Sequence, residues 1–236
     1  SAFDINIIRS MEDEGVVDKT LHVVCNGFKL PEYIENIGEL INDGYDYVIP
    51  VLDNTVELDQ LLGATDKNLN VGIRIASEEE PKFEFYTSRL GIGYQDLVSY
   101  YKSHIQNNKR VNLKMLHFFI NTGIKDTAYY WSELNKCMNV YCELKKICPS
   151  LDSLNIGGGF PIKNNLSYEY DYEYMAEEII NQVKNACVSN GVPEPDIYTE
   201  FGTFTVGESG GAIYSVAHQK RQNDKEKWNM IDSSFI

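Results

Sequence analysis

Short apolar segments alternate with amphipathic segments along most of the chain. Segments such as 47–52 are nearly continuous runs of apolar and β-branched residues, which is typical of strands buried on both faces. Between them, apolar residues recur every three to four positions, as in helices that bury one face. Pro31 stands at the first position of such a helix, where proline is favoured. The predicted strands are 21–25, 47–52, 70–76, 113–119, 153–156 and 196–200, and the predicted helices are 3–11, 31–41, 55–62, 94–105, 126–147 and 172–188.

This alternation predicts an α/β fold. Single strands separated by helices indicate right-handed βαβ units and a parallel sheet. Six strands are predicted, whereas a closed (β/α)8 barrel of the TIM type has eight. We therefore expect residues 1–206 to form an incomplete barrel with strands 3 to 8 present and the first strands missing. An open doubly wound sheet has the same alternation, and the pattern alone leaves it as an alternative.

The pattern changes after residue 206. Residues 207–211 are rich in glycine, and residues 212–217 and 228–231 have the composition of strands with no helix between them. Residues 207–236 are therefore predicted to begin a C-terminal β-domain that the chain contains only in part. The long loop that carries Glu78, Glu79 and Glu80 is predicted to lie between a strand and a helix of the barrel.

Charge and cysteine content restrict the partners. A formal net charge of −14 repels phosphate backbones and anionic lipids, which argues against nucleic acid and membrane partners but suits a cationic substrate. The sequence has no apolar run of 18 residues and no charged-then-apolar leader. Its five cysteines form no CxxC pair, so neither a zinc site nor a disulfide framework is indicated, and a reducing cytoplasm fits best.

The segment NIGGGFP at 155–161 is the strongest chemical signal. Consecutive glycines such as Gly157, Gly158 and Gly159 let the backbone approach a ligand and point N–H groups at an anion, as phosphate binding requires. They follow a predicted strand, and barrel active sites lie at the carboxyl ends of the strands. A flexible turn is the alternative. The spacing does not match the G-x-G-x-x-G dinucleotide fingerprint.

Three further predicted strands have residues at or near their carboxyl ends that could take part in binding or catalysis. Glu200, followed by Gly202, could hold a protonated ring nitrogen or form a salt bridge with a neighbouring strand. Arg74 lies in an apolar strand, where a structural ion pair is the ordinary reason for a cation. His117 and Phe119 share one strand face, and a histidine on such a face is usually packed in the core.

Six motifs in their order along the chain resemble fold-type III pyridoxal-phosphate-dependent decarboxylases, and most closely the biosynthetic arginine decarboxylases. The motifs are CNGFK (25–29), RIA (74–76), SRLG (88–91), LHF (116–118), GGG (157–159) and TEFG (199–202). The resemblance extends from Ser1 to about Ala217 and implies an alanine-racemase-like barrel with pyridoxal 5'-phosphate as cofactor.

The resemblance also implies roles for single residues. Gly157, Gly158 and Gly159, with the backbone around Gly202, would hold the cofactor phosphate, and Glu200 would bond the pyridine nitrogen. Arg74 would orient polar groups of the cofactor, and Thr122 falls where relatives place a hydroxyl near the phosphate. Many relatives have a histidine stacked on the ring where this chain has Phe119, and a phenyl ring can stack but cannot transfer a proton.

Two functional elements of the family are expected outside the chain. The Schiff-base lysine of the relatives lies on the first barrel strand, upstream of Ser1. Their C-terminal cysteine and substrate-binding acid, contributed across the interface of a homodimer or higher homo-oligomer, would lie beyond Ile236. We therefore expect the isolated chain to be inactive, and no metal site is indicated.

The resemblance implies that the parent enzyme converts L-arginine to agmatine and CO2 in polyamine (spermidine) biosynthesis. Ornithine, diaminopimelate and carboxynorspermidine are alternative substrates, because the residues that discriminate among them are expected in the missing part. Two other interpretations stay open: a non-catalytic fragment or pseudoenzyme that binds a phosphorylated ligand, and an unrelated barrel enzyme that binds a phosphorylated metabolite.

Overall fold

A parallel sheet whose strands follow one another in chain order forms the centre of the molecule. The computed structural model describes residues 1–77, 88–163 and 168–233. Within these residues the sheet has the order β1-β2-β3-β5-β6-β7, and each neighbouring pair is parallel. These strands are β1 (Val23–Cys25), β2 (Val48–Leu52), β3 (Leu69–Ala76), β5 (Val111–His117), β6 (Ser153–Asn155) and β7 (Asp196–Tyr198). The sequential order argues against a doubly wound sheet, in which the order reverses.

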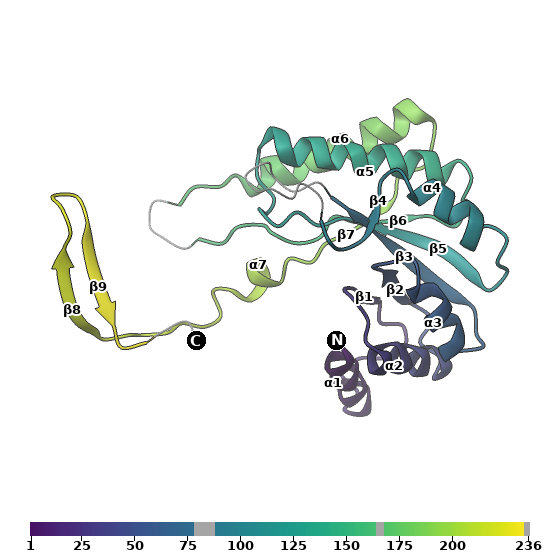
Figure 1. The fold of residues 1–236 in the computed structure, drawn as a ribbon, viewed down its shortest axis with the longest axis horizontal. Coiled ribbons are helices and arrows are strands. Elements are labelled where there is room, and N and C mark those ends of the chain that lie inside the picture. Colours follow the sequence, from purple (N-terminus) through teal and green to yellow (C-terminus); the bar gives the residue numbers. More distant parts are fainter. Residues whose placement is uncertain (78–87, 164–167, 234–236) are drawn as a thin grey trace.

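Helices cover the outer side of the curled sheet (Figure 1). Described helices are α1 (Ala2–Asp13), α2 (Pro31–Asn42), α3 (Glu57–Ala64), α4 (Leu97–Tyr100) with the π-helical turn η1 (Tyr101–Ile105), α5 (Ala128–Lys145), α6 (Tyr172–Asn190) and α7 (Gly202–Val206). The main hydrophobic core lies between the helices and the sheet. A second, smaller cluster consists of Ile49, Val51 and Met115, packed with Val24 and Tyr198, on the strands. The fold is the incomplete (β/α)8 barrel that the sequence predicts.

A bulge in β5 decides which of its residues face the inside of the barrel. Val71 pairs with Leu113, but the next residue of β3, Gly72, pairs with Met115, so Lys114 is an extra residue in the ladder. Leu113 belongs to the core under the helices, whereas Met115 belongs to the inner cluster. Because the alternation continues from the bulge, His117 and Phe119 point to the inner side.

The predicted strands and helices of the barrel are present, and most of their ends shift by one or two residues. The strand predicted at 113–119 occupies 111–117. The helix predicted at 94–105 divides into α4 and η1, and the two-residue strand β4 (Ile92–Gly93), which the pattern did not predict, pairs with β3 before it. The short helix α7 was also not predicted. The predicted loop with Glu78, Glu79 and Glu80 lies outside the described residues.

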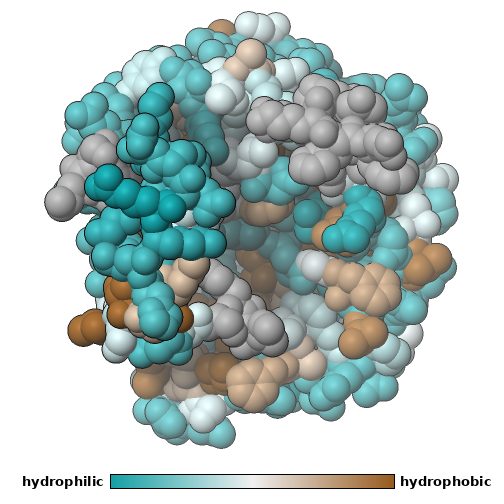
Figure 2. Space-filling view, turned by 60° about the vertical axis from the view of Figure 1, so that its left-hand side comes forward, coloured by the Kyte–Doolittle hydropathy of each residue, from teal (hydrophilic) through white to brown (hydrophobic). Residues whose placement is uncertain are grey.

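The C-terminal residues form an antiparallel hairpin apart from the barrel (Figure 1). Its strands are β8 (Val216–Arg221) and β9 (Lys227–Ile231). The strand predicted at 212–217 was therefore wrong in position, because β8 forms where it has a partner strand and most of its residues are too polar for the apolar pattern to reveal. Figure 2 shows hydrophilic residues over most of the side on which the hairpin lies. The division into domains 1–206 and 207–236 remains a prediction.

Candidate functional site

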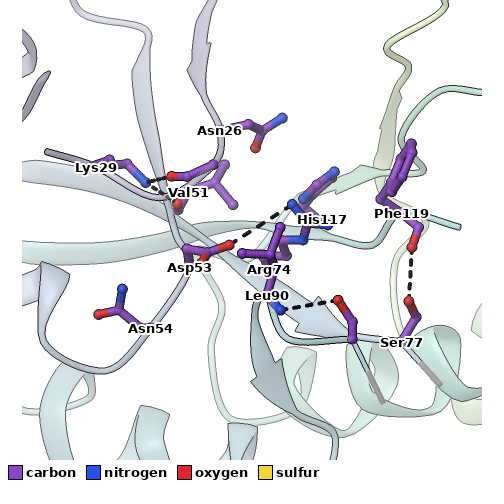
Figure 3. A network of polar contacts seen from close by, with 12 residues as sticks. Asn26, Lys29, Val51, Asp53, Asn54, Arg74, Ser77, Leu90, His117 and Phe119 are labelled. Carbon is purple, nitrogen blue, oxygen red and sulfur yellow. Dashed lines mark hydrogen bonds and ion pairs between the residues drawn. The ribbon is translucent and has the colours of Figure 1, made fainter. Parts of the chain in front are cut away.

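Polar side chains come together at the carboxyl ends of the parallel strands, and Figure 3 shows those on or directly after β1, β2, β3 and β5. Glu200 follows β7, and its side chain is 36% exposed. Asn155, the last residue of β6, donates from Nδ2 to Oε1 of Glu200 over 2.8 Å. Asn26, which follows β1, donates to the same oxygen, and Nε2 of His117 lies 3.4 Å from it. Two side-chain amides thus hold one oxygen of this carboxylate, while Oε2 has no hydrogen-bond partner among the residues that the structure describes.

His117 is buried beside this carboxylate and uncharged. Only 2% of the residue is exposed, and neither ring nitrogen has a well-formed hydrogen bond within the described part of the chain. Burial, together with the smaller effect of the positive charges of Arg74 and Lys29, lowers the pKa of His117 to about 3. The sequence predicted a core histidine. His117 is indeed buried, but it faces the polar inner side of the barrel and not the apolar core.

The stability of the protein is expected to depend on pH through His117. Its pKa is about 6.5 in the unfolded chain and about 3 in the folded protein, so between these values only the unfolded state binds the proton. The free energy of unfolding should therefore fall as the pH is lowered through this window, by up to about 1.4 kcal/mol per pH unit. Urea unfolding of the wild type and of His117→Asn across this range measures the effect. Equal pH dependence in the two proteins would contradict it.

Arg74 and Asp53 form a loose pair next to Phe119. Nη1 of Arg74 lies 4.0 Å from Oδ1 of Asp53, and the guanidinium lies 5.8 Å from the centre of the Phe119 ring. Burial lowers the pKa of Arg74 and raises the pKa of Asp53, and each charge opposes the shift of the other. Nε of Arg74 and Oδ1 of Asp53 lack hydrogen bonds to any described residue. The structural ion pair expected for Arg74 is therefore present but leaves polar atoms of both partners unused.

The glycine triplet lets three loops meet closely. A Cβ atom on Gly158 would overlap the carbonyl oxygen of Glu200, and one on Gly159 would lie 2.7 Å from Cα of Gly123. Gly159 has a φ of 110°, which residues with a side chain rarely adopt. Its carbonyl oxygen accepts a hydrogen bond of 2.9 Å from the backbone of Ile124, in the loop that carries Thr122. The structure thus brings Thr122 and the glycine triplet into neighbouring loops.

The candidate residues lie around two hollows. A cavity of about 320 Å³ is lined by Gly159, Glu200 and Thr203, together with an aromatic wall that includes Phe160 and Phe201. A smaller cavity of about 180 Å³ is lined by Arg74 and Phe119, with Ser77, Arg89 and others. Gly202 lies at the start of α7, and its N–H donates to the carbonyl oxygen of Glu200 over 2.9 Å, so this N–H is engaged within the chain.

Comparison with known proteins identifies the family. Residues 22–207 match the model of "Pyridoxal-dependent decarboxylase, pyridoxal binding domain". The chain belongs to this family. A curated relative, the biosynthetic arginine decarboxylase of Geobacter sp. (strain M21), is 29% identical over an alignment of 219 residues. The match covers 86% of this chain and 34% of the relative. The chain thus spans about a third of the length of the curated relatives that it matches first.

Solved structures of pyridoxal-dependent decarboxylases share the fold. Lysine decarboxylase from Selenomonas ruminantium superposes with a TM-score of 0.70 at 21% identity, covering 98% of this chain and 56% of that one. Diaminopimelate decarboxylase from Helicobacter pylori, crystallised with L-lysine, has a TM-score of 0.72 at 17% identity and covers 97% and 56%.

The residues present fit a pyridoxal group. Buried polar atoms without a hydrogen bond to the described residues include Oδ1 of Asn26, Oδ1 of Asp53, Nε of Arg74 and both ring nitrogens of His117. These residues lie at the carboxyl ends of β1, β2, β3 and β5 (Figure 3), and Glu200, which follows β7, contacts two of them, Asn26 and His117. Buried polar groups are normally paired, so such a cluster is the environment that a polar ligand would complete.

Sequence reasoning gave no role to four residues of this cluster. Asn26 and Asn155 lay inside quoted motifs, His117 was interpreted as core, and Asp53 was not considered. A signal was available for Asn26 and Asp53, since each directly follows a predicted strand, whereas His117 and Asn155 end strands only in the structure. Among the described residues, no group of three or more side chains is arranged to hold a metal ion. None of the described helices is both long and apolar enough to cross a membrane.

Proposed function

We propose that this chain forms the cofactor-binding part of an enzyme that decarboxylates L-arginine to agmatine and CO2 in polyamine biosynthesis. Two observations support the choice of arginine. The curated relatives matched at 29% identity are biosynthetic arginine decarboxylases. The net charge of −14 favours a cationic substrate over an anionic one.

The anchored carboxylate of Glu200 is the observation on which the proposal rests. One of its oxygens is held by Asn26 and Asn155, and the other is free to accept the N–H of a protonated pyridine ring. Neutral His117 next to it adds no competing positive charge. A carboxylate at the ring nitrogen keeps that nitrogen protonated. Pyridoxal phosphate, when bound, would act as an electron sink for the electron pair of the bond that breaks when the carboxyl group leaves.

The remaining predicted residues have distinct tasks in this proposal. The loop of Gly157, Gly158 and Gly159 holds the phosphate, assisted by the hydroxyl of Thr122 and the backbone around Gly202. Phe119 stacks on the cofactor ring, and Arg74 orients polar groups of the cofactor. These tasks agree with the positions of the residues at the carboxyl ends of the strands, where barrel enzymes bind their ligands.

Product analysis tests the proposed substrate. The natural protein that contains this chain should release agmatine and CO2 from L-arginine when pyridoxal phosphate is present. Its kcat/KM for L-arginine should exceed that for L-ornithine, L-lysine and diaminopimelate. Mass spectrometry identifies the amine that is formed. Preference for another of these amino acids would replace the substrate but keep the reaction. Pyridoxal binding with no amine from any of them would contradict decarboxylation.

That last outcome defines the second candidate function, a non-catalytic module that binds pyridoxal phosphate. Phe119 favours it, because the phenyl ring stands at a position where a histidine could also transfer protons.

We further propose that the protein acts in the cytoplasm as a homodimer or larger homo-oligomer. All five cysteines are free and buried, which agrees with a reducing compartment.

A further inference from the structure

The side chain of Asn155 joins the glycine loop to Glu200. The residue is only 1% exposed. Its Oδ1 accepts a hydrogen bond of 2.8 Å from the backbone N–H of Gly157, and its Nδ2 donates one of 2.8 Å to Oε1 of Glu200. A backbone N–H can only donate, so Oδ1 must face Gly157 and Nδ2 must face Glu200. The orientation of this amide is therefore fixed by chemistry as well as by packing.

The backbone around Asn155 is also held in place. Its carbonyl oxygen accepts a hydrogen bond of 3.0 Å from the N–H of Phe118, and the residue pairs with His117 of β5 on one side and Tyr198 of β7 on the other. The amide thus projects from the end of a strand that is paired on both sides. A carboxylate that is anchored through Oε1 to such a support has its plane fixed, and Oε2 then points in one direction.

We propose that Asn155 is a positioning residue that presents Oε2 of Glu200 to the pyridine nitrogen of the cofactor. The inference rests on the assignment of Glu200 to the ring nitrogen in the proposed function. Asn155 itself does not touch the ring. Because the same amide holds the N–H of Gly157, one side chain sets the distance between the loop that binds the phosphate and the carboxylate that binds the ring.

Asn155→Asp is the variant that separates this role from a structural one. Aspartate has almost the same shape and keeps an oxygen for the N–H of Gly157, but it replaces the donor to Glu200 with a second carboxylate oxygen. The two carboxylates repel each other, so Glu200 should leave its position. Asn112→Asp is the matched control, because Asn112 also donates to a side chain on the neighbouring strand, Asn70 over 3.3 Å, but it is exposed and lies at the start of β5.

Binding of two probes to the whole chain provides the readout. The probes are pyridoxal 5'-phosphate and its 1-deaza analogue, in which a C–H group replaces the ring nitrogen. The wild type and Asn112→Asp should bind pyridoxal phosphate about 10- to 100-fold more tightly than the analogue, the range of a hydrogen bond to a charged group. Asn155→Asp should reduce this ratio to less than about 3-fold and leave the affinity for the analogue nearly unchanged, as fluorescence titration would show.

Glu200→Gln distinguishes failure of this inference from failure of the proposed function. If Glu200→Gln, or the wild type itself, shows no preference linked to the ring nitrogen, the assignment of Glu200 is wrong. If Glu200→Gln loses the preference but Asn155→Asp keeps it, only the role of Asn155 is wrong. Equal weakening of both probes by Asn155→Asp would make Asn155 a structural residue of the loop.

A double variant and a second substitution complete the test. In the Glu200→Gln background, Asn155→Asp should have no further effect on the ratio, because two residues that act through one contact are not additive. Should Asn155→Asp fail to fold, as judged by circular dichroism, Asn155→Ser keeps a hydroxyl near the N–H of Gly157 and cannot reach Glu200. The same loss of preference is expected from it, and an unchanged ratio would overturn the proposal.

Discussion

Replacement of Lys29 with methionine should lower the free energy of unfolding by about 3–5 kcal/mol, the cost of leaving one charge of a buried pair alone. The Lys29 side chain is fully buried, and that of Glu57 is 1% exposed. Nζ of Lys29 lies 3.0 Å from Oε2 of Glu57 and also donates to the carbonyl oxygens of Gly27 and Val51. The substitution therefore isolates a buried carboxylate and removes the donor to two carbonyl groups. Urea unfolding followed by circular dichroism measures the loss.

Two further variants show whether the isolated charge is the cause. Lys29→Met combined with Glu57→Gln removes the charge and keeps one oxygen, which can accept from one of the two backbone N–H groups that Glu57 binds, those of residue 29 and Asp53. The double variant should therefore recover part of the loss. Lys114→Met breaks a pair of 2.7 Å with Asp152 whose side chains are 33% and 47% exposed, and it should cost at most about 1 kcal/mol. A double variant no more stable than Lys29→Met alone would attribute the loss to packing.

The Lys29–Glu57 pair also has a consequence for the site. Glu57 accepts hydrogen bonds from the backbone of Lys29 and of Asp53, so it ties the loop after β1 to the loop after β2. The first loop carries Asn26, which holds Glu200, and the second carries Asp53, which faces Arg74. The buried pair thus supports the loops of the candidate site, and the Lys29 ammonium group is engaged with Glu57 and two backbone carbonyl oxygens.

Gly158→Ala is expected to cost about 3 kcal/mol of stability, because an added methyl group would meet backbone that cannot rotate away. The Cβ atom would overlap the carbonyl oxygen of Glu200, and the N–H of Glu200 is itself bonded to the carbonyl oxygen of Gly157 over 2.9 Å. Relief requires the loop after β7 to move, which should also weaken binding of pyridoxal phosphate. Thermal unfolding and cofactor titration measure the two effects.

Gly63→Ala is the control, with an effect of opposite sign. Gly63 lies exposed in α3, and a Cβ atom there would have nothing within 4 Å. Alanine should stabilise this helix by about 0.5–1 kcal/mol, since glycine has the greater backbone entropy in the unfolded chain. A Gly158→Ala protein as stable as the wild type would show that the loops have room to separate, and the close approach would then not be essential.

The architecture could be predicted because it depends on local patterns. Runs such as residues 47–52 and the helical spacing between them indicate buried strands and covering helices, and these patterns need no knowledge of distant contacts. The glycine triplet and Glu200 could be placed at one edge for the same reason, because each follows a strand and parallel strands end on the same side.

The contacts within the site depend on pairs that sequence spacing does not reveal. Asn26 and Glu200 are 174 positions apart, and Asn155 and Glu200 are 45 apart. Their meeting depends on the register of several strands and on the inward or outward direction of each side chain. The shift of β8 by several residues has a similar cause, because the position of a polar strand is set by its partner and not by its own composition.

The bulge at Lys114 determines which face of the sheet each later residue of β5 occupies. If the strand paired without the bulge, Lys114 would take the partner that Met115 now has and the two faces would exchange places downstream. Phe118, now fully buried against the helices, would then face the inner side and His117 would enter the hydrophobic core. The inner surface of β5 therefore depends on the bulge as much as on the identity of its residues. A relative that lacks both the extra residue and the bulge would keep this inner surface, whereas one that keeps the residue but pairs without a bulge would present the opposite face.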